Sequence, residues 1–114
     1  MTVTLLENEL GRLDALFELP RCERVHRYLC NNQELLSAVL EAWEEINSRF
    51  PGASQVLDLV DDPEIENYRL LVLYIVTSLP QDDVYARMDR LYEDWWLDRE
   101  PDVSDQLCFV LRRI

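Results

Sequence analysis

Apolar residues recur every three or four positions in the first half of the chain, the spacing that places side chains on one face of a helix. The series are Leu6, Leu10, Leu13 and Phe17, then Val25, Tyr28 and Leu29, and finally Leu36, Leu40, Trp43, Ile46 and Phe50. Pro51 and Gly52 end the last series, because proline cannot continue a helix and glycine readily terminates one. The pattern predicts helices over residues 1–52.

The beginning of the longest predicted helix carries a recognisable signal. Asn31 is followed three residues later by Glu34. An asparagine in the cap position with a glutamate three residues on resembles a capping box, in which each side chain bonds the other residue's backbone N–H. We therefore expect the helix to begin at Asn31.

The spacing changes to that of strands after residue 52. Leu57 and Leu59 alternate with other residues between positions 55 and 61, which is the period of a strand with one buried face. Residues 69–78 are apolar at almost every position, which is typical of a strand covered on both sides. Alternation returns over residues 106–114 and predicts a third strand.

A helix is predicted between the second and third strands, from about Asp82 to Asp98. Its buried stripe comprises Val84, Met88, Leu91 and Trp95. Tyr85, Tyr92 and Trp96 lie together on a second sector, about a quarter turn from the first. We refer to these three residues as the aromatic ridge. A helix packed on a sheet requires the stripe but not the ridge.

These elements define an α+β fold in a single domain of 114 residues. N-terminal helices (1–52) are followed by β-β-α-β (53–114), which predicts a three-stranded, mostly antiparallel sheet with helices packed against it. A chain of this length can bury about two-thirds of its unfolded surface without disulfides or metals.

The charge of the chain restricts the partners we expect. Asp and Glu number 23 against 11 basic residues, all of them Arg, for a net charge of −12. This balance argues against binding nucleic acid or an anionic membrane, both of which need a basic surface. It is compatible with a basic protein partner, with simple solubility, or with mimicry of nucleic-acid charge if the carboxylates share one face.

The location expected from the sequence is the cytoplasm. The three cysteines are odd in number, and the N-terminus lacks the features of a secretory signal. The longest uninterrupted apolar run covers residues 70–76, far too short to span a membrane.

Cys22, His26 and Cys30 are spaced by four residues, as metal ligands on one helix face would be. Cys22 and Cys30 would nevertheless lie roughly 12 Å apart along the helix axis, too far to share one ion. At most one neighbouring pair, Cys22–His26 or His26–Cys30, is able to contribute, with further ligands from elsewhere. The simpler interpretation is two half-buried thiols and a surface histidine, and no metal or cofactor is predicted.

Two charged segments have alternative interpretations. The acidic loop 58–66 contains Asp58, Asp61, Asp62, Glu64 and Glu66. It is either a solvated loop or the site of a metal-dependent or acid–base enzyme, although it lacks the spacing and glycine of a calcium loop. Arg21, Arg24 and Arg27 either pair with neighbouring acidic residues or contact an acidic partner or a phosphate.

An enzymatic function is not predicted. His26 is the only histidine, and no nucleophile motif or phosphate-binding glycine loop is present. We therefore assign no catalytic residue.

The segments 61–67, 71–79 and 88–98 together resemble a group of uncharacterised small acidic bacterial proteins. The pattern of that group is a "DPEI" turn, a strand ending in "TNL" and a helix ending in "EEWWLD". This chain departs from it with Ser78 in place of the asparagine and with Pro80 where a capping serine is usual. The resemblance implies a compact bacterial cytoplasmic protein without catalytic residues, and an association of some members with small toxin-like genes implies an antitoxin-like role.

The function expected from the sequence is protein–protein interaction, in a regulatory or antitoxin-like module or through self-association. Trp and Tyr dominate the energetic centres of protein interfaces, so the partner-binding residues are expected to be Tyr85, Tyr92 and Trp96. The alternative for Trp96 is burial beneath the N-terminal helices.

Overall fold

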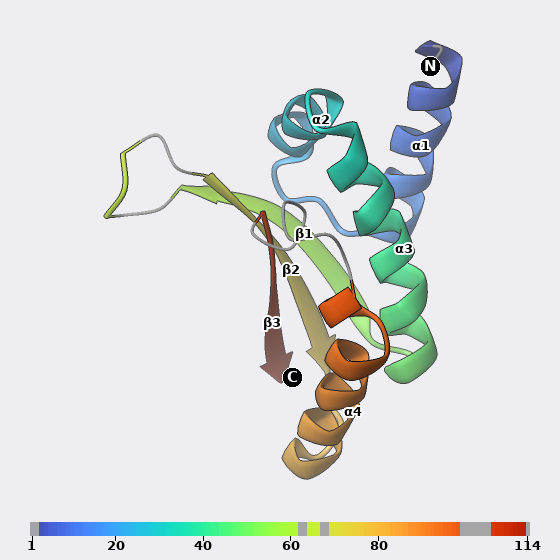
Figure 1. The fold of residues 1–114 in the computed structure, drawn as a ribbon, viewed down its shortest axis with the longest axis vertical. Helices are drawn as coiled ribbons and strands as arrows, with labels where there is room; N and C mark the ends of the chain where they lie inside the picture. Colours follow the sequence, from blue (N-terminus) through green and yellow to red (C-terminus); the bar gives the residue numbers. More distant parts are fainter. Residues whose placement is uncertain (1–2, 62–63, 67–68, 99–105, 114) are drawn as a thin grey trace.

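Helices precede the sheet, and one further helix separates the second and third strands (Figure 1). The computed structural model describes residues 3–61, 64–66, 69–98 and 106–113, and the side chains within these ranges except those of residues 3–6 and 113. The elements are α1 (Val3–Leu16), α2 (Cys22–Cys30), α3 (Gln33–Arg49), β1 (Ser54–Asp61), β2 (Arg69–Thr77), α4 (Gln81–Asp94), the 3₁₀ helix η1 (Trp96–Asp98) and β3 (Leu107–Arg113). The predicted α+β order is confirmed.

The strands form one sheet in the order β1-β2-β3, with β2 in the centre. β1 runs antiparallel to β2 and places Leu57 opposite Leu73. β3 runs parallel to β2 and places Phe109 on the other side of Leu73. The sheet is therefore mixed rather than mostly antiparallel, because the connection through α4 returns the chain to the same end of the sheet before β3 begins.

Register and burial assign the strand residues, apart from the terminal Asp61, Arg69 and Arg113, to one of two faces. The inner face carries Gln55, Leu57, Leu59, Leu71, Leu73, Ile75, Thr77, Leu107, Phe109 and Leu111. The outer face carries Ser54, Val56, Asp58, Val60, Leu70, Val72, Tyr74, Val76, Cys108, Val110 and Arg112. Along β1 the inner residues are buried and the outer ones are partly exposed, so the strand alternates as the sequence predicted.

The core lies between the inner face and the helices. It contains the predicted stripe of α4, namely Val84, Met88, Leu91 and Trp95, together with Leu36 and Ile46 of α3. Figure 1 shows the helices gathered to one side of the three strands. Burial of each such side chain contributes about 1.5–3 kcal/mol relative to exposure. The side chain of Leu6, predicted for the first helical stripe, lies outside the described residues.

The capping box predicted at Asn31 is wrong. The residue before α3 is Asn32, and neither residue caps α3 with its side chain. Instead, Asn31 Nδ2 donates to the carbonyl of Arg27 at 3.2 Å, and Asn32 Nδ2 donates to that of Tyr28 at 2.8 Å. Because α2 ends immediately before these residues, its last carbonyls have no further helical turn to bond and attract the two side-chain amides.

The predicted end of α3 is confirmed. The helix stops at Arg49, and Gly52 adopts a positive φ of 84° that favours glycine. The backbone N–H of Ala53 donates to the carbonyl of Phe50 at 3.1 Å and closes the turn into β1.

Candidate functional site

The aromatic ridge does not form one continuous strip, because α4 ends at Asp94 rather than at the predicted Asp98. Trp95 leaves helical geometry with φ −138°, and Trp96 begins η1. The Trp96 ring lies 4.9 Å from the Phe109 ring and is only 8% exposed. Its surroundings are therefore β3 and the neighbouring Trp95, at 5.3 Å, rather than solvent.

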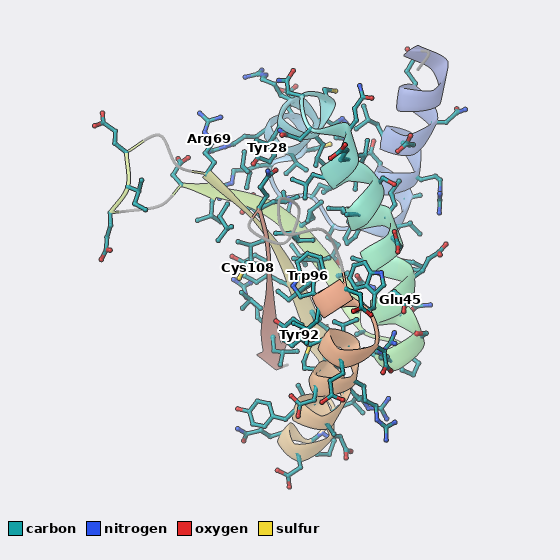
Figure 2. All side chains as sticks on the ribbon, in the orientation of Figure 1. Tyr28, Glu45, Arg69, Tyr92, Trp96 and Cys108 are labelled. Atoms are coloured by element: carbon teal, nitrogen blue, oxygen red, sulfur yellow. The ribbon has the colours of Figure 1, made fainter. Side chains whose placement is uncertain are left out.

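The two tyrosines of the ridge have different surroundings. Tyr92 is partly buried with its ring 6.2 Å from that of Phe109, and this burial raises the pKa of its phenol. Tyr85 is 55% exposed, and its hydroxyl accepts a hydrogen bond from Gln81 Nε2 at 2.8 Å. The structure thus brings Tyr92 and Trp96 together beside β3 and leaves Tyr85 on the surface. Figure 2 shows Tyr92 and Trp96 on the helix side of β3, with Cys108 on the other side.

The outer face of the sheet is an apolar surface that the sequence did not identify. Three rows cross all three strands: Ser54–Val76–Arg112, Val56–Tyr74–Val110 and Asp58–Val72–Cys108. None of the outer-face side chains belongs to the core between sheet and helices. Val72 is buried, Ser54 and Arg112 are exposed, and the others are partly exposed. The apolar run of β2 predicted cover on both sides, but the helices that the structure describes pack against the inner face.

The two edges of the sheet differ. Beyond β1, Glu18 forms a parallel bridge with Val56, with its N–H donating to Gln55 and its carbonyl accepting from Leu57, each at 3.0 Å. Among the described residues, no strand pairs with the outer edge of β3. Within the described ranges, the backbone groups along that edge therefore have no strand partner.

Two arginines at the start of α2 form ion pairs with aspartates of β1. Arg21 binds both carboxylate oxygens of Asp58, at 3.0 and 2.7 Å, and Arg24 binds Asp61 at 2.7 Å. Hydrogen bonding from these guanidinium groups lowers the pKa of both carboxyls. Arg21 and Arg24 therefore pair with the sheet rather than with residues of their own helix.

These pairs also bear on the acidic loop 58–66. Asp58 and Asp61 are neutralised by arginine, while Glu64 and Glu66 lie exposed. Asp62 lies outside the described residues. Within the described part of this loop, the carboxylates do not converge into a group of three metal ligands.

One group of potential ligands does converge elsewhere. Cys22 and His26, one turn apart on α2, meet Asp14 of α1, and their ligand atoms all lie within 4.8 Å of one another. Cys30 is not a member of the group. The sequence suggested the Cys22–His26 pair but gave no indication of Asp14, because that carboxylate belongs to α1 and only the folded structure brings it beside α2.

Comparison of the chain with family models, with curated proteins and with solved structures finds no match. No helix in the described ranges combines the length and apolar character needed to cross a lipid bilayer.

Proposed function

We propose that this chain is a non-enzymatic protein-interaction module whose binding surface is the outer face of the sheet with the free edge of β3. The observation that supports it is the apolar character of a face that none of the described helices covers. The outer face and the β3 edge together are called the interaction surface below. The favoured occupant is a second copy of the chain.

The composition of the interaction surface supports association. Apart from Ser54, Asp58 and Arg112, the outer face consists of aliphatic side chains, one tyrosine and one cysteine. Contiguous apolar patches on a folded protein commonly mark interaction sites. An unpaired edge strand adds backbone donors and acceptors that a strand from a partner satisfies directly. A partner that binds here therefore buries apolar side chains and pairs a strand with β3 at the same surface.

Charge favours contact at this face even though the chain carries −12 overall. Asp58 is already paired with Arg21, and the Arg112 guanidinium lies 4.1 Å from the centre of the Tyr74 ring. The outer face thus has little net charge of its own. Two copies approach through it without bringing their carboxylate-rich helical surfaces together.

Only part of the aromatic ridge belongs to the proposed interaction surface. Tyr92 is the ridge residue that is both partly exposed and adjacent to β3, so it extends the interaction surface onto the helix side. Trp96 supports β3 from beneath through Phe109. A regulatory or antitoxin-like role would follow if the surface also accepts a basic protein.

The test is to place a charge in the middle of the interaction surface. Val110 is partly exposed on the outer face, so Val110→Glu keeps the fold while opposing burial of that face. Ala86→Glu adds the same charge at an exposed position of α4 and is the matched control. Molar mass is measured by light scattering over a wide concentration range, and unfolding in urea checks that both variants fold.

We expect the parent chain and Ala86→Glu to form dimers and Val110→Glu to be monomeric. A monomeric parent chain at every concentration would contradict self-association. Dimers that persist in a folded Val110→Glu variant would place the contact elsewhere on the molecule.

A further inference from the structure

Asp14, Cys22 and His26 form a compact polar cluster where the end of α1 meets the start of α2. His26 Nε2 lies 2.6 Å from Asp14 Oδ1 and 3.6 Å from Cys22 Sγ. Cys22 Sγ lies 3.8 Å from the same Asp14 oxygen. One nitrogen, one oxygen and one sulfur therefore face a common point, and they come from two different helices.

The cluster does not have the geometry of a nucleophilic triad. In such a triad, the nucleophile bonds one imidazole nitrogen and the carboxylate bonds the other. Here both contacts involve the same atom, Nε2 of His26, so the ring has no second nitrogen in the relay. Burial, and then the negative charge of Asp14, raise the pKa of the Cys22 thiol, which disfavours a free reactive thiolate.

The same geometry suits a tetrahedral metal ion. Zinc bonds of about 2.3 Å to sulfur and 2.0–2.1 Å to nitrogen or oxygen place a sulfur about 3.6 Å from either lighter ligand. The observed separations of Cys22 Sγ from His26 Nε2 and Asp14 Oδ1 are 3.6 and 3.8 Å. The distance between His26 Nε2 and Asp14 Oδ1 is 2.6 Å in their hydrogen bond, and it must increase to about 3.3 Å when both atoms bind the ion. The Asp14 side chain is 48% exposed, so it is free to make this adjustment.

We propose that Asp14, Cys22 and His26 bind a zinc ion, with water or another exchangeable ligand in the fourth position. A thiolate with an imidazole selects zinc over magnesium or calcium, which prefer sites made wholly of oxygen. The ion replaces the thiol proton, because the thiolate is the form of cysteine that binds metal, and it offsets the charge of Asp14. Binding is therefore coupled to proton release and strengthens with rising pH.

The ion would also join two helices. Asp14 lies on α1, whereas Cys22 and His26 lie on α2, and the connection between these helices contains Pro20. A ligand that binds only the folded chain raises its stability according to its concentration. Zinc is accordingly expected to raise the melting temperature of the full chain.

The probe is the metal alone: Co²⁺ titrated into the reduced, chelator-treated chain, followed by competition with Zn²⁺. A cobalt–thiolate bond gives a charge-transfer absorption in the near ultraviolet, which reports sulfur ligation directly. We expect one ion per chain and displacement of cobalt by zinc. The absorption should be lost in Cys22→Ser and in the double variant that combines Asp14→Asn with His26→Ala.

Cys30→Ser is the matched control, because Cys30 lies on the same helix, is equally half-buried and is outside the cluster. It should retain cobalt absorption and the zinc-dependent rise in melting temperature. Unfolding curves recorded without metal establish that each variant is folded. No thiolate absorption in the parent chain, or absorption lost in Cys30→Ser but kept in Cys22→Ser, would overturn the proposal.

Discussion

Trp95 and Trp96 are consecutive, yet both rings are buried, at 8% exposure each. Neighbouring residues on a helix point about 100° apart, so a continuous helix would direct one ring away from the core. The end of α4 at Asp94 removes that conflict. Trp95 completes the stripe of α4, and its indole N–H donates to Glu41 at 2.8 Å, while Trp96 turns onto Phe109.

Replacing Trp96 tests its structural role. Trp96→Ala should lower the free energy of unfolding by about 3–5 kcal/mol, because it removes a large side chain from a packed aromatic cluster. Leu97 is 72% exposed, so Leu97→Ala is the control and should change it by less than about 0.5 kcal/mol. Urea unfolding measures both. Equal effects at the two positions would show that Trp96 does not support the core.

The sequence predicts only some of the buried side chains in and next to α4. Val84, Met88 and Leu91 follow from periodicity alone, since any helix packed on a sheet buries such a stripe. The position of Trp96 depends on where the helix stops. No glycine or proline lies between Asp94 and Trp96 to mark that end.

Element boundaries follow the sequence most closely where the backbone itself demands a special residue. Gly52 has φ +84° at the end of α3, a conformation that other L-residues adopt at a cost. The start of α3 does not require a special backbone conformation, and the side chains of the two asparagines there bond carbonyls of α2 instead. This difference explains why the end of α3 was predicted correctly and its cap was not.

The two glycines of the chain should respond in opposite directions to alanine. Gly52→Ala should destabilise by about 1–2 kcal/mol, because it places a Cβ in the left-handed region. Gly11 lies within α1, and a Cβ there meets no atom within 4 Å, so Gly11→Ala should stabilise by about 0.5–1 kcal/mol. Thermal unfolding compares the pair. A stabilising Gly52→Ala would contradict the turn geometry.

At the scale of the whole molecule, ion pairs connect the helical half of the chain to the sheet. Arg21 and Arg24 accompany α2, and Asp58 and Asp61 lie on β1. Sequence spacing does not reveal such pairs, because 37 residues separate each arginine from its carboxylate. The outer face, which none of the described helices covers, was equally hard to predict from the sequence. Periodicity shows which strand is apolar but not on which side the helices pack.

These pairs predict how stability changes with acid. The folded-state pKa of Asp58 is lowered from its ordinary value of 3.8 by hydrogen bonds from Arg21. The pair therefore stabilises the folded chain above pH 3.8 and loses its effect as the pH falls through the lower, folded-state value. Asp58→Asn should be less stable than the parent chain at pH 7 by about 1 kcal/mol.

The difference between the two proteins should shrink once the pH falls below 3.8. Urea unfolding at a series of pH values measures it. Glu93→Gln neutralises an exposed carboxylate of α4 and serves as the control. A gap between Asp58→Asn and the parent chain that stays constant down to strongly acidic pH would refute the assignment.

The parallel pairing of β3 with the central strand also governs how the protein is made. β2 leaves the ribosome with one neighbour, β1, already synthesised, but its other neighbour follows only after α4 and η1. Until residues 107–113 emerge, Leu71 and Leu73 lack their β3 partners, and Trp96 lacks Phe109. A nascent chain at this stage exposes an aromatic surface and an open edge of the central strand, the features that molecular chaperones recognise and that promote aggregation. β3, which is translated after its packing partners, therefore completes this side of the core.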